Sequence, residues 1–265
     1  MFVTRLLTAA ALLAAFLWAL FWLDRAAFSI VAALIVGSGA FEWARLSGVR
    51  SPWLAVLYGA ACAFLCLSLL QISRLLPWIY ASSLLLWLIA VPYWLARGFA
   101  PAAQRALPVI GVLVLVPAGV ALAAMPPLLA LLALGLVWVA DTGAYLAGTI
   151  LGRHKLAPAI SPRKTWEGVA GGAIAGLIYA IICAMFTPGL EARVEGAIWV
   201  PFVAGTLLLF ALSVAGDLLE SALKRRAGAK DSGSLLPGHG GVLDRIDSAT
   251  AVLPAAALLA GTLGA

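Results

Sequence analysis

The segment from Ser221 to Asp247 gathers ionisable side chains and glycines in a chain that is otherwise apolar. It holds 5 of the 17 Lys and Arg residues and 3 of the 11 Asp and Glu residues, although 64% of the chain is hydrophobic. Ionisable groups close to a bilayer are costly and are usually kept for ion or substrate handling. Basic groups, carboxylates and glycines together suit a polyanion and a metal ion, so we expect phosphoryl or nucleotidyl transfer chemistry.

Two pairs of acidic residues stand at the ends of this segment. If the helix that precedes the segment continues past its apolar run, Asp217, Glu220, Ser221 and Lys224 share one face. Asp244 and Asp247 lie on one face of the next helix. Because Mg²⁺ is typically held by one or two carboxylates plus substrate phosphates, Asp217 and Asp244 are candidate ligands from two helices. The simpler alternatives are a Glu220–Lys224 salt bridge and acids that favour the positive end of a helix dipole.

Small residues surround the remaining polar groups of the segment. The stretch Ala227–Ser234 lets the backbone approach a ligand, and its N–H groups can cradle phosphate, although the order is not that of a P-loop. His239 is flanked by Gly238, Gly240 and Gly241. This setting favours an exposed imidazole that contacts phosphate or carries a proton; a structural hydrogen bond that shapes the loop is the alternative.

A second polar cluster lies between Asp141 and Gly168. Asp141 falls within an apolar run, where a carboxylate needs a partner, an ion or a proton. The loop that follows carries Arg153, His154 and Lys155, and then the sequence SPRKTWEG. Its cations suit polyphosphate or anionic lipid headgroups. The alternative, a positive-inside anchor, does not account for the Thr, Glu and Gly of this loop.

The composition of the chain predicts an integral membrane protein. The mean hydropathy is +1.08, and 11% of residues are charged, whereas about a quarter would be charged in a soluble domain. The apolar runs are continuous rather than alternating, which predicts an all-α bundle and not a transmembrane barrel. Cys62, Cys66 and Cys183 all lie in apolar runs and are interpreted as packing residues.

About nine apolar runs are expected to cross the bilayer, and several are shorter than the roughly 20 residues of a perpendicular span. A signal peptide is the alternative for the first run, because Arg5 precedes it. The expected spans are Leu6–Leu23, Ala26–Phe41, Trp53–Leu70, Pro77–Ala96, Ala106–Ala124, Pro126–Ile150, Gly168–Phe186, Ile198–Asp217 and Ala249–Gly264.

The basic residues predict the orientation of these spans. With nine crossings, 14 of the 17 Lys and Arg residues fall on one side. The positive-inside rule then places the N-terminus and the polar loops 151–167 and 218–248 in the cytoplasm. We expect one integral membrane domain, residues 1–265, with N-terminal spans in 1–125 and catalytic spans and loops in 126–265. A bacterial inner membrane, with the active site on the cytoplasmic side, is the expected location.

The polar segment also resembles a known family signature. The order Ser221-x-Leu223-Lys224-Arg225, Lys230-Asp231-x-Gly233 and Leu236-Pro237-x-His239-Gly240-Gly241-Val242-x-Asp244-Arg245-Ile246-Asp247 is similar, without departure, to that of CDP-diacylglycerol synthases, also called phosphatidate cytidylyltransferases. The Asp141–Gly168 segment resembles the second recognisable region of this family. The N-terminal half matches only as a set of apolar spans.

The resemblance implies an enzyme of phospholipid biosynthesis that joins CTP to phosphatidate and releases pyrophosphate. It implies a need for Mg²⁺, with a monovalent cation such as K⁺ beside it, a homodimer, and no nucleic-acid partner. A transporter is the alternative from another class, but it predicts inverted repeats, and the sequence shows none. A polyprenol kinase, which would release CDP, is the alternative enzyme.

Roles follow for residues that match the signature or its second region, and for Asp217, which helix spacing places on the face of Ser221 and Lys224. The phosphatidate oxygen must attack the α-phosphorus of CTP, and a metal would neutralise the charge that develops. No covalent intermediate and no strong general base are needed, because phosphate is already ionised at pH 7. The expected catalytic residues are Asp217, Lys224, His239, Asp244 and Asp247. The expected metal ligands are Asp217 and Asp244, with Asp141 in support. The expected substrate-binding residues are Ser161, Lys164, Thr165, Ser221, Arg225, Lys230, Asp231, Gly240, Gly241 and Arg245.

Overall fold

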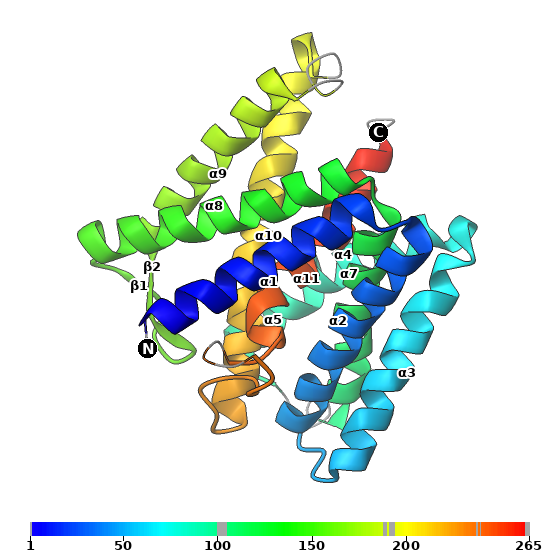
Figure 1. Cartoon of the computed structure of the whole chain (residues 1–265). Coiled ribbons are helices and arrows are strands. Elements are labelled where there is room, and N and C mark those ends of the chain that lie inside the picture. Colours follow the sequence, from blue (N-terminus) through cyan, green and yellow to red (C-terminus); the bar gives the residue numbers. More distant parts are fainter. Residues whose placement is uncertain are drawn as a thin grey trace.

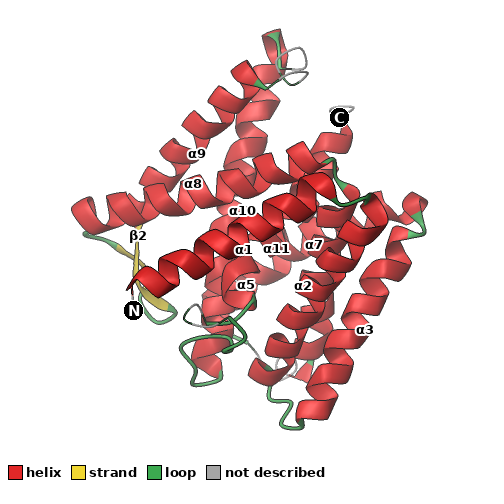
Figure 2. Ribbon diagram, viewed as in Figure 1, coloured by secondary structure: helices red, strands yellow, loops and turns green. Residues whose placement is uncertain are grey.

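The chain is almost entirely helical, as the continuous apolar runs predict (Figures 1 and 2). The computed structural model describes residues 2–99, 105–187, 190, 194–236, 238 and 240–262, and within these ranges the side chains of residues 8–261. The helices are α1 (Phe2–Trp22), α2 (Arg25–Leu46), α3 (Pro52–Leu70), α4 (Leu76–Leu85), α5 (Val91–Arg97), α7 (Leu107–Ala124), α8 (Pro127–Leu151), α9 (Trp166–Phe186), α10 (Trp199–Arg226) and α11 (Leu243–Thr262). The short helical turns are η1 (Ser73–Leu75), η2 (Leu86–Ala90) and η3 (Gly196–Ile198).

Seven stretches of the described chain are long and apolar enough to cross a membrane. They are Arg25–Leu46, Pro52–Leu70, Ser73–Arg97, Leu107–Ala124, Pro127–Leu151, Trp166–Phe186 and Gly196–Arg226. The other two expected spans fall in α1, whose described apolar part is the shorter Thr8–Trp22, and in α11, which begins with charged residues. The helical membrane protein is therefore confirmed, whereas the count of nine spans and the sidedness remain predictions.

The loop between α8 and α9 folds into a small hairpin that the all-α expectation missed. Strand β1 (Lys155–Ala157) pairs antiparallel with β2 (Ser161–Thr165). Thr165 then starts α9, because its side-chain oxygen accepts a hydrogen bond from the backbone N–H of Gly168 at 3.1 Å. The second strand thus ends directly at a helix N-terminus, which holds the hairpin against the end of the bundle.

Small residues allow the helices around this hairpin to approach closely. Gly143 of α8 faces α9, where an added Cβ would come within 3.1 Å of the Gly171 carbonyl oxygen. Gly216 of α10 faces α11, and a Cβ there would come within 2.6 Å of the Asp247 carbonyl oxygen. Such contacts are typical of helix packing in membranes, where small residues let backbones meet. As a result, the residue after Gly216, Asp217, is held beside the first turns of α11.

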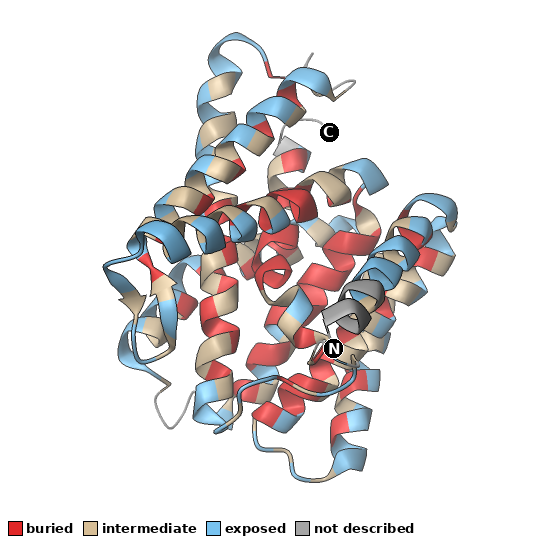
Figure 3. Cartoon of the chain, turned by 60° about the vertical axis from the view of Figure 1, so that its left-hand side comes forward, coloured by how far each residue is buried: buried red, intermediate tan, exposed pale blue. Residues whose placement is uncertain are grey.

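The most buried part of the molecule is formed by α7, α11 and the helices that surround them, whereas α1, α3 and α9 are largely exposed (Figure 3). Large apolar side chains cover the exposed surface, among them Trp53, Ile150 and Val200, each at least 75% exposed. This distribution is that of a bundle whose outer side chains face lipid tails rather than water.

Candidate active site

The predicted site residues meet where α10, α11 and the hairpin come together. The helix α10 continues past the expected end of its apolar run at Asp217 and reaches Arg226. The part of α10 from Asp217 onward therefore carries Asp217, Glu220, Ser221 and Lys224 on one helix face, as the sequence spacing predicts. The acids at this end form two groups with different partners.

The first group, here called the open cluster, consists of Asp141 of α8, Asp217 of α10, Asp247 of α11 and Lys164 of β2. Lys164 Nζ lies 2.5 Å from Asp217 Oδ2, and these side chains are 24% and 33% exposed. Asp217 Oδ1 also accepts a hydrogen bond from Ser221 Oγ at 3.3 Å. Asp141 and Asp247 both interact electrostatically with Asp217. Three carboxyl groups thus neighbour one ammonium group, and repulsion between them opposes ionisation of all three unless a further cation is bound.

The second group, here called the closed cluster, consists of Glu42, Glu220, Lys224, Ser232 and Asp244. Lys224 Nζ lies 2.5 Å from Glu220 Oε2 and 2.7 Å from Asp244 Oδ1. The expected alternative, a Glu220–Lys224 salt bridge, is therefore present, but it is buried rather than solvated. No described group donates a hydrogen bond of good geometry to the Glu220 oxygens, so Lys224 Nζ and the neighbouring Asp244 carboxyl are the polar groups that face this buried side chain.

Asp244 is enclosed on all sides. Its Oδ2 accepts hydrogen bonds from Ser232 N and Ser232 Oγ, both at 2.9 Å, and from Gly241 N at 2.8 Å. Burial opposes its ionisation, but the hydrogen bonds with Glu220, Lys224 and the two backbone N–H groups hold the pKa of Asp244 well below its usual range. The carboxylate is 10% exposed, and its partners fix the shape of the loop that precedes α11.

Glu42 is a member of the closed cluster that the sequence analysis missed. It belongs to α2, is 1% exposed, and accepts hydrogen bonds from Leu243 N at 2.8 Å and from Val242 N at 3.1 Å; Ser232 Oγ, whose one proton is shared between Glu42 and Asp244, lies 3.1 Å from Oε2. The first N–H groups of α11 have no partner within their own helix, so Glu42 caps that helix from a distant part of the sequence. The expected second span ends at Phe41, which placed Glu42 in a loop; an acid at the end of an apolar run was the available signal.

Two glycines of the signature make room for this carboxylate. A Cβ at Gly233 would overlap Glu42 Oε1, and a Cβ at Gly241 would overlap both Ser232 Oγ and Glu42 Oε2. Gly240 adopts a φ of 81°, a left-handed conformation that glycine adopts without strain. These glycines therefore allow the loop to pack closely around Glu42 and Asp244.

The hairpin that carries Lys164 is held by Glu167 at its base. The Glu167 carboxylate accepts hydrogen bonds from Arg153 N at 3.0 Å and from His154 N at 3.2 Å, and it pairs with His154 Nδ1 at 2.6 Å. Thr165 is 4% exposed, and its oxygen caps α9, so the structure gives it an architectural contact. Lys164 is thereby directed to Asp217.

The other expected substrate-binding residues lie at the rim of these clusters. Ser161 is half-buried on β2, and Ser221 is half-buried on α10. Arg225 is exposed, and its Nε donates a hydrogen bond to the Ile160 carbonyl at 3.4 Å, which joins the end of α10 to the hairpin. Lys230, Asp231 and Arg245 are exposed. His239 lies outside the described residues.

The donor chemistry of the open cluster fits a hard divalent cation. Among the described side chains, no three carboxylates, imidazoles or thiolates lie close enough together to form a metal site by themselves. Mg²⁺ does not require such a cage, because it usually keeps water ligands and takes one or two carboxylates plus substrate phosphates. In the closed cluster, Asp244 could ligate a metal only by giving up existing partners.

Comparison with known proteins agrees with this chemistry. The model of the cytidylyltransferase family matches residues 3–263. A phosphatidate cytidylyltransferase of Pseudomonas aeruginosa is 38% identical over 269 residues, covering 98% of this chain and 97% of that protein. The enzyme of the same name from Haemophilus influenzae is 49% identical over 122 residues, 45% of this chain and 41% of that protein. One from Staphylococcus saprophyticus is 48% identical over 118 residues, 44% of this chain and 43% of that protein. The chain is therefore a member of the cytidylyltransferase family.

Proposed function

We propose that the chain transfers the cytidylyl group of CTP to phosphatidate, which gives CDP-diacylglycerol and pyrophosphate. The printed names of its relatives support this reaction. The observation in the structure that carries the proposal is the ion pair between Asp217 of α10 and Lys164 of the basic hairpin, with Asp141 of α8 and Asp247 of α11 near enough to Asp217 to interact with it electrostatically. Both substrates are polyanions, and this is the place where acids for a cation and cations for phosphates meet.

The described side chains would act mainly by binding and charge neutralisation. Lys164 and Arg225, at the hairpin side of the site, are suited to the phosphates of CTP, since both are basic and at least partly exposed. An oxygen of the phosphatidate phosphate is the nucleophile, and it attacks the α-phosphorus as pyrophosphate leaves. Phosphate is already ionised at neutral pH, so no side chain has to remove a proton. Catalysis then rests on positioning and on stabilising developing charge.

Mg²⁺ is the cofactor that this chemistry implies. Asp217 would hold it, with Asp141 and Asp247 beside it and phosphate oxygens completing the shell. Such an ion supplies neutralisation of charge on the phosphates when bound. The expectation that Asp244 is a second ligand remains a prediction, because in the structure Asp244 is engaged by Lys224 and the loop. A monovalent cation such as K⁺ in the same acidic region also remains a prediction.

The finer topology belongs to the same proposal. Nine spans, with the N-terminus and the candidate site on the cytoplasmic side of a bacterial inner membrane, agree with 14 of the 17 Lys and Arg residues lying on one side. CTP is a cytoplasmic metabolite, so this orientation would expose the hairpin to it. A homodimer is proposed from the family resemblance alone.

The test is an assay of the purified chain in lipid nanodiscs with α-labelled CTP and phosphatidate, with and without Mg²⁺. The proposal predicts label in the lipid fraction together with an equal amount of pyrophosphate. A kinase would release CDP and leave the lipid without label, and a transporter would release neither product. Either of these outcomes would contradict the proposal.

A further inference from the structure

A large apolar cavity lies beneath α1 and ends beside the candidate site. Its volume is about 630 Å³, and its walls come from α1, α2, α7, α8 and α11. The lining includes Leu13 of α1, Ala118 of α7 and Leu253 of α11. Of the described residues that line it, Arg245 is the one that carries a charge.

The helix that covers this cavity is attached to the bundle mainly at one end. In the described part of α1, the buried residues are Ala19 and Leu20, near its C-terminus, and Phe16 meets Phe28 of α2 with ring centroids 6.4 Å apart. Residues 9–15 are all exposed, including Leu12 and Leu13, although Ala9, Leu12 and Leu13 line the cavity. Figure 1 shows α1 crossing in front of α11. The N-terminal half of α1 therefore lies over the cavity without close packing against its far wall.

The inner end of the cavity belongs to the signature segment. Leu236, Val242, Arg245 and Ile246 line this end. Arg245 directly follows Asp244 in the chain and lies two residues before Asp247. An apolar space that ends in a cation matches a molecule with a hydrocarbon tail and an anionic phosphate head. The phosphate would then reach the clusters from the start of α11, where Arg245 lies.

From this placement we propose that the cavity beneath α1 holds acyl chain of phosphatidate, with Arg245 at the phosphate and α1 as the wall that yields to let the lipid in. The inference rests on the proposed function. It divides the site between the substrates: the lipid approaches beneath α1, and the nucleotide approaches over the β1–β2 hairpin. Burial of hydrocarbon in the cavity would contribute to binding of long-chain lipids and not of short-chain ones.

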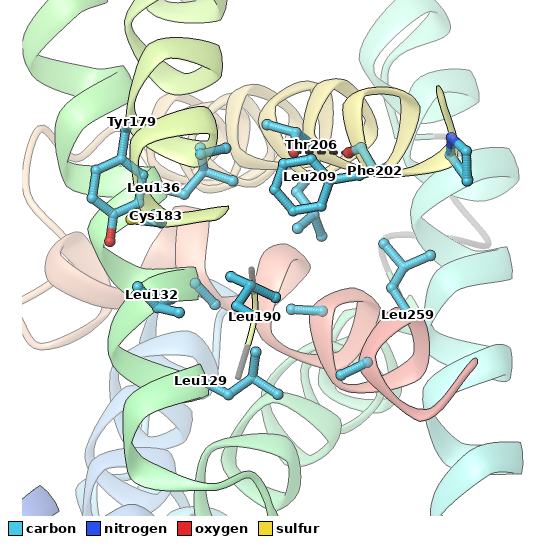
Figure 4. A pocket seen from close by; sticks show the side chains of 16 residues that line it. Leu129, Leu132, Leu136, Tyr179, Cys183, Leu190, Phe202, Thr206, Leu209 and Leu259 are labelled. Atoms are coloured by element: carbon cyan, nitrogen blue, oxygen red, sulfur yellow. Dashed lines mark hydrogen bonds between the residues drawn. The ribbon is translucent and has the colours of Figure 1, made fainter. Parts of the chain in front are cut away.

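A second apolar cavity provides a contrast. It has a volume of about 190 Å³ and is lined by α8, α9, α10 and α11, with Leu132, Tyr179 and Leu209 among its residues (Figure 4). No Lys, Arg, Asp or Glu is among its described lining residues, and none belongs to the signature segment. This cavity therefore lacks the charged end that would orient a phospholipid, and it serves as the control.

The test compares dioleoyl phosphatidate with water-soluble dihexanoyl phosphatidate as substrates of the intact protein. Ala9→Trp adds a side chain at the exposed wall of the cavity, and Ala118→Phe adds one at the buried wall. Loss of about two buried methylene groups corresponds to roughly a tenfold change in binding. We expect Ala9→Trp and Ala118→Phe to raise KM for the dioleoyl lipid about tenfold relative to the dihexanoyl lipid, and to leave KM for CTP unchanged.

Two matched variants serve as controls. Ala11→Trp places the same side chain on the face of α1 that does not line the cavity, and Leu132→Phe narrows the second cavity; both should behave as wild type. If Ala118→Phe does not fold, Ala9→Trp alone decides. Equal changes for both lipids, or no change in Ala9→Trp, would overturn the inference while the proposed function stands. Wild-type protein that converts neither lipid would remove the proposed function and the inference with it.

Discussion

The two acidic clusters stand at the same end of the bundle and use the same residue type in different ways. In the closed cluster, Asp244 has partners for both oxygens and is 10% exposed. In the open cluster, Asp217 is 33% exposed and shares Lys164 with two neighbouring acids. The oxygens of Asp244 are all hydrogen-bonded or ion-paired, so this acid stabilises the loop. The open cluster has more acids than cations, which favours binding of a metal ion. The clusters therefore divide the site into a part that shapes it and a part that binds the reactants.

The ionisation of the α11 acids shows the same division. Burial is opposed by hydrogen bonds at Asp244, and the pKa of this carboxyl is held below its usual range. At Asp247, burial and then the neighbouring Asp217 raise the pKa to about 8. Two carboxyls one helical turn apart thus differ because Asp244 is held by several donors, whereas Asp247 accepts one hydrogen bond, from Ser248 N, and is close to other acids. A divalent cation in the open cluster would relieve this repulsion.

The largest effect is expected for Asp217→Asn. Because this change removes a candidate metal ligand from the open cluster, transfer should fall at least about 1,000-fold. The half-exposed ion pair with Lys164 contributes little to folding, so the melting temperature should stay within about 2 °C of wild type. Glu195→Gln, a change at an exposed acid outside the site, is the control. Near-normal activity in Asp217→Asn would show that the open cluster is not the metal site.

Asp244→Asn should inactivate the protein and also destabilise it. The change leaves Lys224 with one carboxylate partner and weakens the bonds to Ser232 and Gly241, which breaks a buried ion pair at a cost of about 3 kcal/mol. Thermal unfolding in detergent should then shift down by about 6 °C or more. A stable but inactive variant would instead place Asp244 with the open cluster, as a metal ligand in the sense that the sequence predicts.

The two lysines should differ in the same manner. Lys224→Ala leaves Glu220 and Asp244 buried without a cation, so we expect a loss of stability comparable to that of Asp244→Asn. Lys164→Ala should leave stability unchanged and raise KM for CTP about tenfold. Melting temperatures and initial rates of both variants test this expectation. Equal losses of stability in Lys164→Ala and Lys224→Ala would contradict the distinction between the two clusters.

The smallest expected effect, and the most specific to the closed cluster, is the loss of stability on removing Glu42. Glu42→Ala should lower stability by about 2 kcal/mol, since buried N–H groups of the loop lose their acceptor. Gly233→Ala should be harmful in wild type, where the new Cβ meets Glu42. In the Glu42→Ala background, Gly233→Ala should lower the free energy of unfolding by less than about 0.5 kcal/mol more, because the side chain that the new Cβ would meet is absent. If the stability losses of Glu42→Ala and Gly233→Ala simply add in the double variant, Gly233 does not serve to make room for Glu42.

Much of the fold could be predicted from the sequence, because continuous apolar runs are read directly as membrane helices. Each of the nine expected runs overlaps a helix. The hairpin was missed because Lys155–Thr165 contains two prolines and shows no regular alternation of apolar and polar residues that would indicate strands. Glu42 was missed because its partners lie about 190 residues or more away in sequence, and no local pattern reports such a distance.

The candidate site could be predicted in its membership but not in its pairing. Spacing or resemblance had singled out Asp217 and Lys164, which form an ion pair, and Asp141 and Asp247, which interact electrostatically with Asp217; their roles in a site remain predictions. The assignment of Asp217 and Asp244 to one metal depended on which faces of α10 and α11 meet. That contact is set by Gly216, which brings α10 against the Asp247 backbone, and this follows from packing rather than from periodicity.

The most direct test of the division between the clusters is binding of Mn²⁺, as a spin probe for Mg²⁺, measured by electron paramagnetic resonance in the presence of CTP. We expect CTP-dependent Mn²⁺ binding in wild type and in Glu195→Gln, and its loss in Asp217→Asn. Undiminished Mn²⁺ binding by a folded Asp217→Asn variant would show that the metal ion is not held by the open cluster.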